Sequence, residues 1–477
     1  MRSLAKRAFS IFKILLVKSA GLIYTVVKES VMRRAAMDRR EIRNIWMRYA
    51  EENRDLLDGR VQADIERFRK GDCRICLLDK DGKPAAGKKV KVTQKTHDFK
   101  YGANIFMLDE FPDAERNAVY REQFKSLFNL ATVPFYWNTL EPEQGKPRFS
   151  VDSPKVYRRP APDHCIKYCE ENGILPKLHC LVYERFVPEW APVDDMKAME
   201  ALYEKRFAEI AERYSGKLYE VEVINELLCE WYWNFRSVIS TRRDILEWAF
   251  ALAQKYFKDD VLVINEGQPL EGTAKTDYRH PYFMMIDAAL AKGVRIDKIG
   301  LQHHTFTGCG AANEEMFAAE LAKGSRHFDP ATILKALDIY AEFNLPLEIT
   351  EITVPTFGET EEDELLQADL LEVLYTCLFS HPAVDAVVYW NLPDGCAYEP
   401  KDGGWNENRC RGGLYHNDMT PKIAAVRMHE LFNVRWHTDI ELETDENGFV
   451  EFRGFFGEYT AECDGIVTSF GIHKGRQ

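Results

Sequence analysis

The sequence predicts an α/β fold, a (β/α)8 (TIM) barrel with small β-rich additions at both ends and a basic helical leader. The first observation is a series of eight short apolar segments in the middle of the chain, most of them separated by helical periodicity. The second is the length of 477 residues, because such barrels commonly take about 250 residues or more as one unit. The third is that polar and acidic residues stand where several apolar segments end, which is where a barrel carries its functional groups.

The predicted strands and helices alternate along the chain. The strands are placed at residues 101–105, 130–133, 174–181, 219–225, 261–265, 298–302, 347–350 and 386–390. The clearest helices are placed at residues 198–214, 242–256, 330–343 and 361–379. This alternation favours a closed parallel barrel. An open doubly wound sheet is the structural alternative, but no G-x-G-x-x-G or Walker loop follows any predicted strand, which removes its usual nucleotide-binding support.

Short β segments flank the barrel, which we place at residues 99–435. Residues 71–98 contain two alternating runs around the turn Asp81-Gly82-Lys83-Pro84 and predict a β-hairpin. Residues 436–477 contain further short alternating runs broken by Asp- and Gly-containing turns. From this pattern we hypothesise that the two pieces pack together beside the barrel.

The N-terminal leader, residues 1–70, is basic at its start and helical in pattern. Its apolar stretch at residues 19–27 is too short to span a bilayer, and no clear cleavage site follows it. We favour an exposed or self-packed helix over a membrane contact through the basic face. The 11 cysteines are scattered and odd in number, so we expect a cytoplasmic protein. Export or surface association through the N-terminal segment is the alternative.

Overall charge and cysteine spacing argue against two classes of ligand. A formal net charge of −13 disfavours nucleic acid as the principal partner, which requires a basic surface. Cys73 and Cys76 have zinc-knuckle spacing but fall in a predicted strand, where residues three apart point to opposite faces, and no second pair stands at ribbon spacing. We therefore expect no metal ion at these cysteines, and we expect no cofactor.

Two acidic residues at predicted strand ends carry the functional hypothesis. Glu226 follows the fourth strand and Glu351 the seventh, so both would face the mouth where the carboxyl ends of barrel strands converge. Glycoside hydrolysis uses such a pair, one carboxylic acid protonating the departing oxygen while the other, ionised, attacks the anomeric carbon. If the carboxyl groups lie about 5–5.5 Å apart, the anomeric configuration is retained. A structural ion pair at the barrel rim is the alternative for either residue alone.

Several sequence blocks occur in a fixed order around these strand ends. They are Trp137-Asn138-Thr139-Leu140-Glu141-Pro142-Glu143-Gln144-Gly145 with Phe149, His179-Cys180-Leu181-Val182 with Pro188 and Trp190, Glu222-Val223-Ile224-Asn225-Glu226, Gly300-Leu301-Gln302-His303-His304, Ile349-Thr350-Glu351, Trp390 with Asp394 and Tyr398, and Met419-Thr420-Pro421-Lys422. In this order they resemble the blocks of glycoside hydrolase family 10, the endo-1,4-β-xylanase family of clan A, over about residues 99–430. The resemblance implies a (β/α)8 barrel, retaining hydrolysis of a β-linked oligo- or polysaccharide, and no metal.

The resemblance also implies roles for individual residues. Glu226 would be the acid/base and Glu351 the nucleophile. Asn225 would hydrogen-bond the sugar 2-hydroxyl, Gln302 would lie near the acid/base, and His304 would position the nucleophile. The other substrate-binding residues that we expect are His179, Trp137, Glu184, Trp390 and Tyr398, the last two as stacking platforms.

The chain departs from the family pattern in the shell around the sugar. Residues 133–137, Val-Pro-Phe-Tyr-Trp, replace E-N-x-M-K-W, so an Asn and a Lys are missing. Three more replacements follow the third strand: Tyr183 for Trp, Glu184 for His and Phe186 for Gln. Thr353 stands where the family has an Asp that supports the histidine. Such losses change selectivity, so xylan or xylo-oligosaccharide is the leading substrate and another β-linked glycan its competitor.

Three alternatives stay open. A catalytically retired carbohydrate-binding barrel is suggested by the altered shell, and an exo-acting, β-xylosidase-like enzyme of clan A would share the same barrel. A metal site at His303 and His304 is less favoured, because adjacent strand residues point to opposite faces.

Residues 231–233, Trp-Tyr-Trp, follow the fourth strand and form a candidate sugar platform, although packing under a loop explains them equally well.

Overall fold

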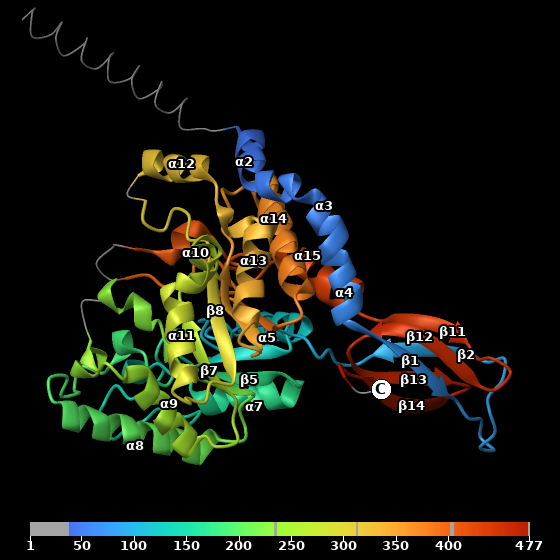
Figure 1. Ribbon diagram of the computed structural model, residues 1–477, viewed down its shortest axis with the longest axis horizontal. Helices are drawn as coiled ribbons and strands as arrows, with labels where there is room; N and C mark the ends of the chain where they lie inside the picture. Colours follow the sequence, from blue (N-terminus) through green and yellow to red (C-terminus); the bar gives the residue numbers. More distant parts are fainter. Residues whose placement is uncertain (1–37, 233–235, 312, 401–404, 476–477) are drawn as a thin grey trace, which may run out of the picture.

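The computed structural model describes residues 38–232, 236–311, 313–400 and 405–475. Its centre is a closed barrel of parallel strands in the order β10-β3-β4-β5-β6-β7-β8-β9 (Figure 1). The strands are β3 (Lys100–Asn104), β4 (Leu130–Pro134), β5 (Leu175–His179), β6 (Glu220–Asn225), β7 (Leu262–Glu266), β8 (Lys298–His304), β9 (Leu347–Thr353) and β10 (Val384–Tyr389). The predicted (β/α)8 barrel and the position of each of its strands are confirmed.

Helices that lie between successive strands, and one after the last strand, surround the barrel (Figure 1). They are α5 (Ala114–Leu127), α6 (Trp137–Leu140), α7 (Pro162–Asn172), α8 (Met196–Tyr214), α9 (Ile245–Tyr256), α10 (Pro269–Thr276), α11 (Pro281–Ala291), α12 (Glu314–Lys323), α13 (Pro330–Ala341), α14 (Glu361–Ser380) and α15 (Ile423–Glu430). The start of α14 shows how the sequence sets a boundary. The Thr360 hydroxyl accepts from the backbone N–H of Asp363, whose carboxylate accepts from the backbone N–H of Thr360, so exposed donors of the first turn are satisfied.

The lower interior of the barrel, toward the start of the strands, is filled by buried charges. Lys177 Nζ lies 2.7 Å from Glu348 Oε1 and 3.2 Å from Glu220 Oε1, and Lys298 Nζ lies 2.7 Å from Glu220 Oε2. These side chains are nearly inaccessible to solvent. Separating these partners would leave an uncompensated buried charge, which is costly. The cluster therefore stabilises the observed arrangement of β5, β6, β8 and β9.

The helical segment before the barrel packs against its outside rather than standing free. It comprises α2 (Arg39–Glu52), α3 (Arg54–Leu56), the π-helical turn η1 (Leu57–Val61) and α4 (Gln62–Phe68). Trp46 of α2 is 1% exposed, donates from Nε1 to the backbone oxygen of Leu321 at 3.0 Å, and lies with its ring 4.5 Å from that of Phe357. Residues 1–37, with the basic and apolar stretch of the predicted leader, lie outside the described residues.

A β module beside the barrel combines both ends of the described chain (Figure 1). Its strands are β1 (Lys70–Cys76), β2 (Lys89–Gln94), β11 (Asp439–Glu443), β12 (Phe449–Phe455), β13 (Gly457–Cys463) and β14 (Ile466–Ile472). The predicted hairpin at residues 71–98 is wrong, because β1 pairs with β12 while β2 lies between β11 and β13. Alternation locates a strand but not its partner, and here the C-terminal strands provide a shared apolar core.

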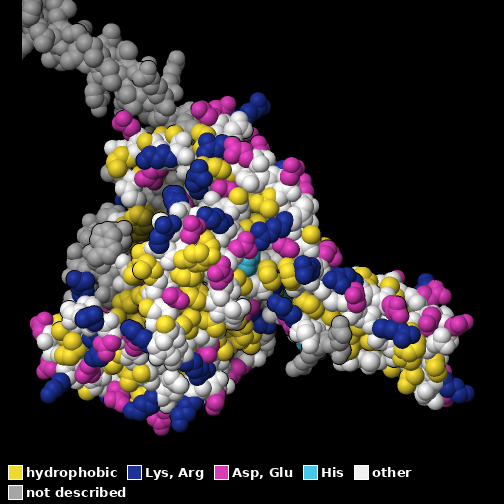
Figure 2. Space-filling model, viewed as in Figure 1, with side chains coloured by type: hydrophobic (Ala, Val, Ile, Leu, Met, Phe, Trp, Pro, Cys, Tyr) yellow, Lys and Arg dark blue, Asp and Glu magenta, His cyan; other side chains and the backbone are white. Residues whose placement is uncertain are grey.

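The β module packs against the barrel through buried contacts. Arg69, at the junction of α4 and β1, donates from Nη2 to the backbone oxygens of His381 at 2.5 Å and Val384 at 2.7 Å. Phe455 of β12 belongs to the main apolar core. On the face shown in Figure 2, basic and acidic side chains are interspersed over both the barrel and the module. Within the described residues, every helix is either too short or too polar to cross a bilayer.

If α2 is an integral part of the barrel, Trp46→Ala will lower the free energy of unfolding by about 3–5 kcal/mol, because it removes a large buried ring. The measurement is chemical denaturation of the full chain followed by circular dichroism. Val434→Ala, at a side chain that is 63% exposed, is the control and is expected to change stability by less than about 0.5 kcal/mol. A Trp46→Ala change as small as that of the control would contradict this packing.

Candidate active site

The mouth of the barrel, at the carboxyl ends of the strands, opens into a cavity of about 680 Å³. Its wall brings together most of the residues that the sequence singled out. They are Glu226, Glu351, Asn225, His179, Gln302, His304, Trp390 and Tyr398. These side chains come from β5, β6, β8 and β9 and from the segment after β10, so residues far apart in the sequence share one space.

The two glutamates are linked through side-chain amides. Gln302 Nε2 donates to Glu226 Oε1 at 3.0 Å and to Asn225 Oδ1 at 3.2 Å. Asn265 Nδ2 donates to Asn225 Oδ1 at 2.9 Å and to Glu351 Oε1 at 3.3 Å. The chain of contacts Glu226–Gln302–Asn225–Asn265–Glu351 therefore fixes one carboxyl group relative to the other across the four strands β6 to β9.

The backbone at Glu226 has a conformation that residues other than glycine seldom adopt. Its φ is 54°, in the left-handed region that costs free energy for a side chain with a Cβ. The turn directly after β6 aims the carboxyl group into the cavity, where the Tyr183 hydroxyl donates to Glu226 Oε2. An unfavourable backbone conformation at a polar residue that lines a cavity is typical of a functional position.

Glu351 is held from its other side by an imidazole. His304 Nε2 lies 3.2 Å from Glu351 Oε2, and His304 Nδ1 lies 2.8 Å from Thr353 Oγ1. The hydroxyl of Thr353 therefore takes the place where the family pattern has a carboxylate. Burial lowers the pKa of His304 to about 4, so the ring is neutral at neutral pH and supplies Glu351 with a hydrogen bond rather than a positive charge.

In the cavity wall, His179 connects the site to the buried charges of the barrel. His179 Nδ1 lies 2.8 Å from Glu222 Oε1, and its Nε2 lies 3.0 Å from the hydroxyl of Tyr136. Burial acts to lower the pKa of His179, but the neighbouring Glu222 outweighs it, so the pKa is raised. A protonated His179 in turn favours the ionised form of Glu351.

Burial sets the protonation of the carboxyl groups near the mouth. It raises the pKa of Glu351 well above its usual range, an effect that His179 opposes and Glu226 reinforces. Glu266, next to Asn265, is also buried, and its pKa is raised to about 7. Ionisation of Glu351 therefore depends on the protonated imidazole of His179, which opposes the effect of burial.

Aromatic rings form much of the cavity wall. Trp390, 6% exposed, stands edge-on to His179 and to Phe106, with ring centroids 5.4 and 5.2 Å apart. Phe306 stacks on His304 at 4.4 Å, and Trp405 lies beside it with 46% of its surface exposed. Flat apolar faces of this kind suit the C–H faces of pyranose rings. The side chains of the candidate platform at residues 231–233 lie outside the described residues.

Two predicted substrate-binding residues are placed elsewhere. Trp137 is 4% exposed and lies outside the cavity wall, where its Nε1 donates to Glu141 Oε2 at 3.0 Å. Glu184, 2% exposed, accepts hydrogen bonds from the hydroxyls of Tyr203 at 2.6 Å and Ser237 at 2.7 Å. The prediction that these two residues contact substrate is therefore wrong. After β4 and β5 the backbone directs both side chains away from the cavity, where they make hydrogen bonds to neighbouring protein groups.

A metal ion has little to bind near this site. Within the described residues, His179, Cys180 and Glu222 form the one group whose potential ligand atoms lie within 4.8 Å of one another. Both ring nitrogens of His179 are already hydrogen-bonded, and burial raises the pKa of the Cys180 thiol well above its usual range, whereas a metal ligand must be a thiolate. His303 and His304 point apart, since His303 Nε2 lies 2.8 Å from the backbone oxygen of His327.

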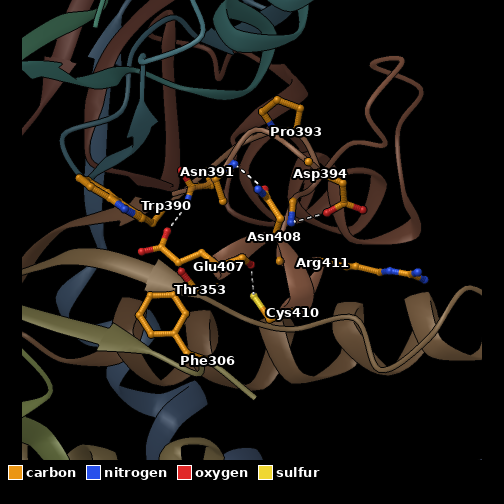
Figure 3. Close-up of a pocket in the computed structure, with 14 residues that line it drawn as sticks. Phe306, Thr353, Trp390, Asn391, Pro393, Asp394, Glu407, Asn408, Cys410 and Arg411 are labelled. Atoms are coloured by element: carbon orange, nitrogen blue, oxygen red, sulfur yellow. Dashed lines mark hydrogen bonds between the residues drawn. The ribbon is translucent and has the colours of Figure 1, made fainter. Parts of the chain in front are cut away.

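Several residues of the site were missed in the sequence. Asn265 ends a predicted strand just as Glu226 and Glu351 follow theirs, so its position was a usable signal. For Tyr183 the sequence indicates only that a tryptophan of the family pattern is replaced. Arg158, Arg159 and Glu407 come from long connecting segments where no pattern indicates the direction of a side chain. Figure 3 shows Glu407 beside Trp390, with its carboxylate hydrogen-bonded to Asn391 Nδ2 at 3.0 Å.

Comparison with known sequences places the chain in one family. The profile of Glycosyl hydrolase family 10 matches residues 95–430. Endo-1,4-beta-xylanase 2 of Arabidopsis thaliana is 26% identical over 432 residues, covering 87% of this chain and 34% of that protein. Anti-sigma-I factor RsgI6 of Acetivibrio thermocellus is 25% identical over 413 residues, covering 83% of this chain and 45% of that protein. The chain thus spans less than half the length of these relatives.

The fold agrees with solved structures of the same family. Xylanase 10B from Thermotoga petrophila RKU-1, in complex with xylobiose, aligns with a TM-score of 0.54 and 21% identity over 71% of this chain and 95% of that one. A GH10 structure from Paenibacillus barcinonensis aligns with a TM-score of 0.52 and 18% identity. These alignments show the shared barrel. Because the family profile matches more than half of its residues, the chain belongs to glycosyl hydrolase family 10.

Proposed function

We propose that this protein is a retaining glycoside hydrolase that cleaves β-1,4-linked glycans, xylan or xylo-oligosaccharides above all, with Glu226 as acid/base and Glu351 as nucleophile. The observation that carries the proposal is the hydrogen-bonded amide chain that holds these two carboxyl groups in one cavity. A pair of carboxyl groups flanking the scissile bond is what glycoside hydrolysis requires. Family membership and relatives named as xylanases support the choice of substrate.

The proposed reaction proceeds in two displacements. Ionised Glu351 attacks the anomeric carbon while protonated Glu226 gives its proton to the departing glycosidic oxygen, so one C–O bond forms as another breaks. Glu351 loses its charge in the glycosyl-enzyme, and Glu226, now ionised, takes a proton from water. That water attacks the same carbon from the opposite side, which releases Glu351 and retains the configuration.

Neighbouring groups have separate tasks in this scheme. Gln302 and Tyr183 hold Glu226 through its two oxygens. Asn225 is held by Gln302 and Asn265 at the edge of the cavity, where it is placed to hydrogen-bond the sugar 2-hydroxyl, an interaction that strengthens in the transition state. Trp390 supplies an apolar face for the reacting sugar.

Removal of the nucleophile tests the assignment directly. Glu351→Ala is expected to lower kcat on an activated aryl β-xyloside by about 10⁴-fold, and azide is expected to restore turnover with a glycosyl azide of inverted, α configuration. Glu226→Ala should instead give the β azide, because its nucleophile is intact. The product anomer is measured by NMR, and Glu451→Ala on the β module is the control. Wild-type-like activity of Glu351→Ala would contradict the assignment.

Release of single sugars alone from xylohexaose would indicate an exo enzyme.

The acidic limb of the pH profile is expected to follow the ionisation of Glu351. Attack requires the carboxylate, and burial raises the pKa of Glu351, so kcat/KM falls as the pH drops through that raised value. Thr353→Asp places a carboxylate beside His304 Nδ1, raises the pKa of His304 from about 4, and through the charged ring favours ionised Glu351. The limb should therefore move to lower pH, whereas Thr353→Val should not move it downward. The pH dependence of kcat/KM checks this, and an upward shift for Thr353→Asp would contradict it.

A further inference from the structure

Two consecutive arginines line the cavity but have no part in the proposed reaction. Arg158 and Arg159 belong to the long segment between β4 and α7, and both border the cavity that contains Glu226 and Glu351. They also border an adjoining hollow of about 550 Å³, and Tyr398 is common to the two walls. The arginine pair therefore lies where the two hollows meet.

Most of the hydrogen-bond donors of this pair are unused. Arg158 is 7% exposed, its Nη2 donates to Asn391 Oδ1 at 2.6 Å, and its buried Nε has no acceptor. Arg159 donates from Nη1 to the backbone oxygen of Arg158 at 2.7 Å, and its Nε likewise has no acceptor. A guanidinium group carries several more N–H donors than these, and leaving buried donors unpaired is costly.

The pair also lacks a direct counter-ion. Among the described residues, no carboxylate oxygen lies within 4.0 Å of either guanidinium group. Glu407 and Glu110 act on Arg159 from farther away, and burial lowers its pKa to about 10, so it stays charged at neutral pH. Glu407 is already hydrogen-bonded to Asn391 (Figure 3).

The wall of the adjoining hollow contains these two arginines and, among the described residues, one acidic residue, Glu399. The carboxylate of Glu399 accepts from Asn406 Nδ2 at 2.9 Å rather than from either arginine. Arg159 is held in place by the ring of Tyr136, whose centroid lies 4.2 Å from the guanidinium carbon. Two fixed guanidinium groups with free donors form a site for a planar anion such as a carboxylate, which they bind through paired, charge-assisted hydrogen bonds.

We propose that Arg158 and Arg159 bind the carboxylate of a uronic acid branch on the glycan, with the branch in the adjoining hollow and the main chain across Glu226 and Glu351. The inference rests on the proposed function, since it assumes that a β-linked glycan occupies the cavity. It makes the preferred substrate an acidic glycan, whereas an unbranched neutral chain leaves both guanidinium groups without an anionic partner.

The test compares two ligands that differ in one functional group. A xylo-oligosaccharide with a glucuronic acid branch and the same molecule with that carboxyl group reduced to an alcohol are titrated into Glu351→Ala by calorimetry. The acidic ligand is expected to bind about tenfold or more tightly, with a preference that weakens as salt is added. Adding Arg158→Gln or Arg159→Gln should bring the ratio of the two affinities toward one while affinity for the reduced ligand changes little.

Control variants separate charge at the site from overall charge. Arg74→Gln, on the β module and paired with Glu451, removes the same charge and should leave the ratio unchanged. Arg159→Lys keeps the charge but not the forked donors and should give an intermediate ratio. Equal affinity of the two ligands for the parent protein, or equal losses for both ligands in the arginine variants, would overturn the inference.

Failure of the inference and failure of the proposed function give different results. Cleavage of linear xylohexaose by the wild-type protein without any preference for the acidic ligand would leave the function standing and overturn the arginine site. Absence of both cleavage and binding for all three oligosaccharides would overturn the two together. If either glutamine variant is misfolded by circular dichroism, the comparison of acidic and reduced ligands on the parent protein decides alone.

Discussion

The candidate site depends on a chain of amide hydrogen bonds between two carboxyl groups. Gln302 of β8, Asn225 of β6 and Asn265 of β7 link Glu226 to Glu351 through hydrogen bonds along the wall of the cavity. Each of these contacts joins different strands, so the spacing of the carboxyl groups is set by closure of the barrel rather than by local sequence. Losing one amide would leave a buried acceptor unpaired, at a cost of about 1–3 kcal/mol.

The barrel supports this arrangement with charge as well as apolar packing. From the Lys177–Glu348 pair the polar contacts continue through Glu222 to His179 and the hydroxyl of Tyr136, both of which line the cavity. Such pairs are costly to bury and more costly to break, so they favour one strand arrangement over its alternatives. The same low-dielectric surroundings raise the pKa of Glu351. Burial in a low-dielectric interior therefore affects both the ion pairs that stabilise the barrel and the ionisation of Glu351.

Much of the barrel and its two central residues could be predicted from the sequence, because strand periodicity and strand-end polarity are local signals. Glu226 directly follows β6, Glu351 lies in the last part of β9, and both line the cavity at the mouth. The partner of a strand and the direction of a loop side chain depend on residues far away in the sequence. For this reason the sequence pattern pairs β1 with the wrong strand and places Trp137 at the substrate. The arginine pair shows the same limit, since only the folded segment before α7 brings Arg158 to Asn391.

In the proposed reaction, Glu351 forms a covalent bond to the sugar. Incubation with an activated 2-deoxy-2-fluoro xylobioside slows breakdown of the glycosyl-enzyme, because the fluorine destabilises the second transition state, and peptide mass mapping then locates the attached sugar. We expect one label per chain, on Glu351, and none in Glu351→Ala. Attachment to another carboxyl group, such as that of Glu266, would contradict it, as would an unlabelled chain that nevertheless turns over unfluorinated substrate.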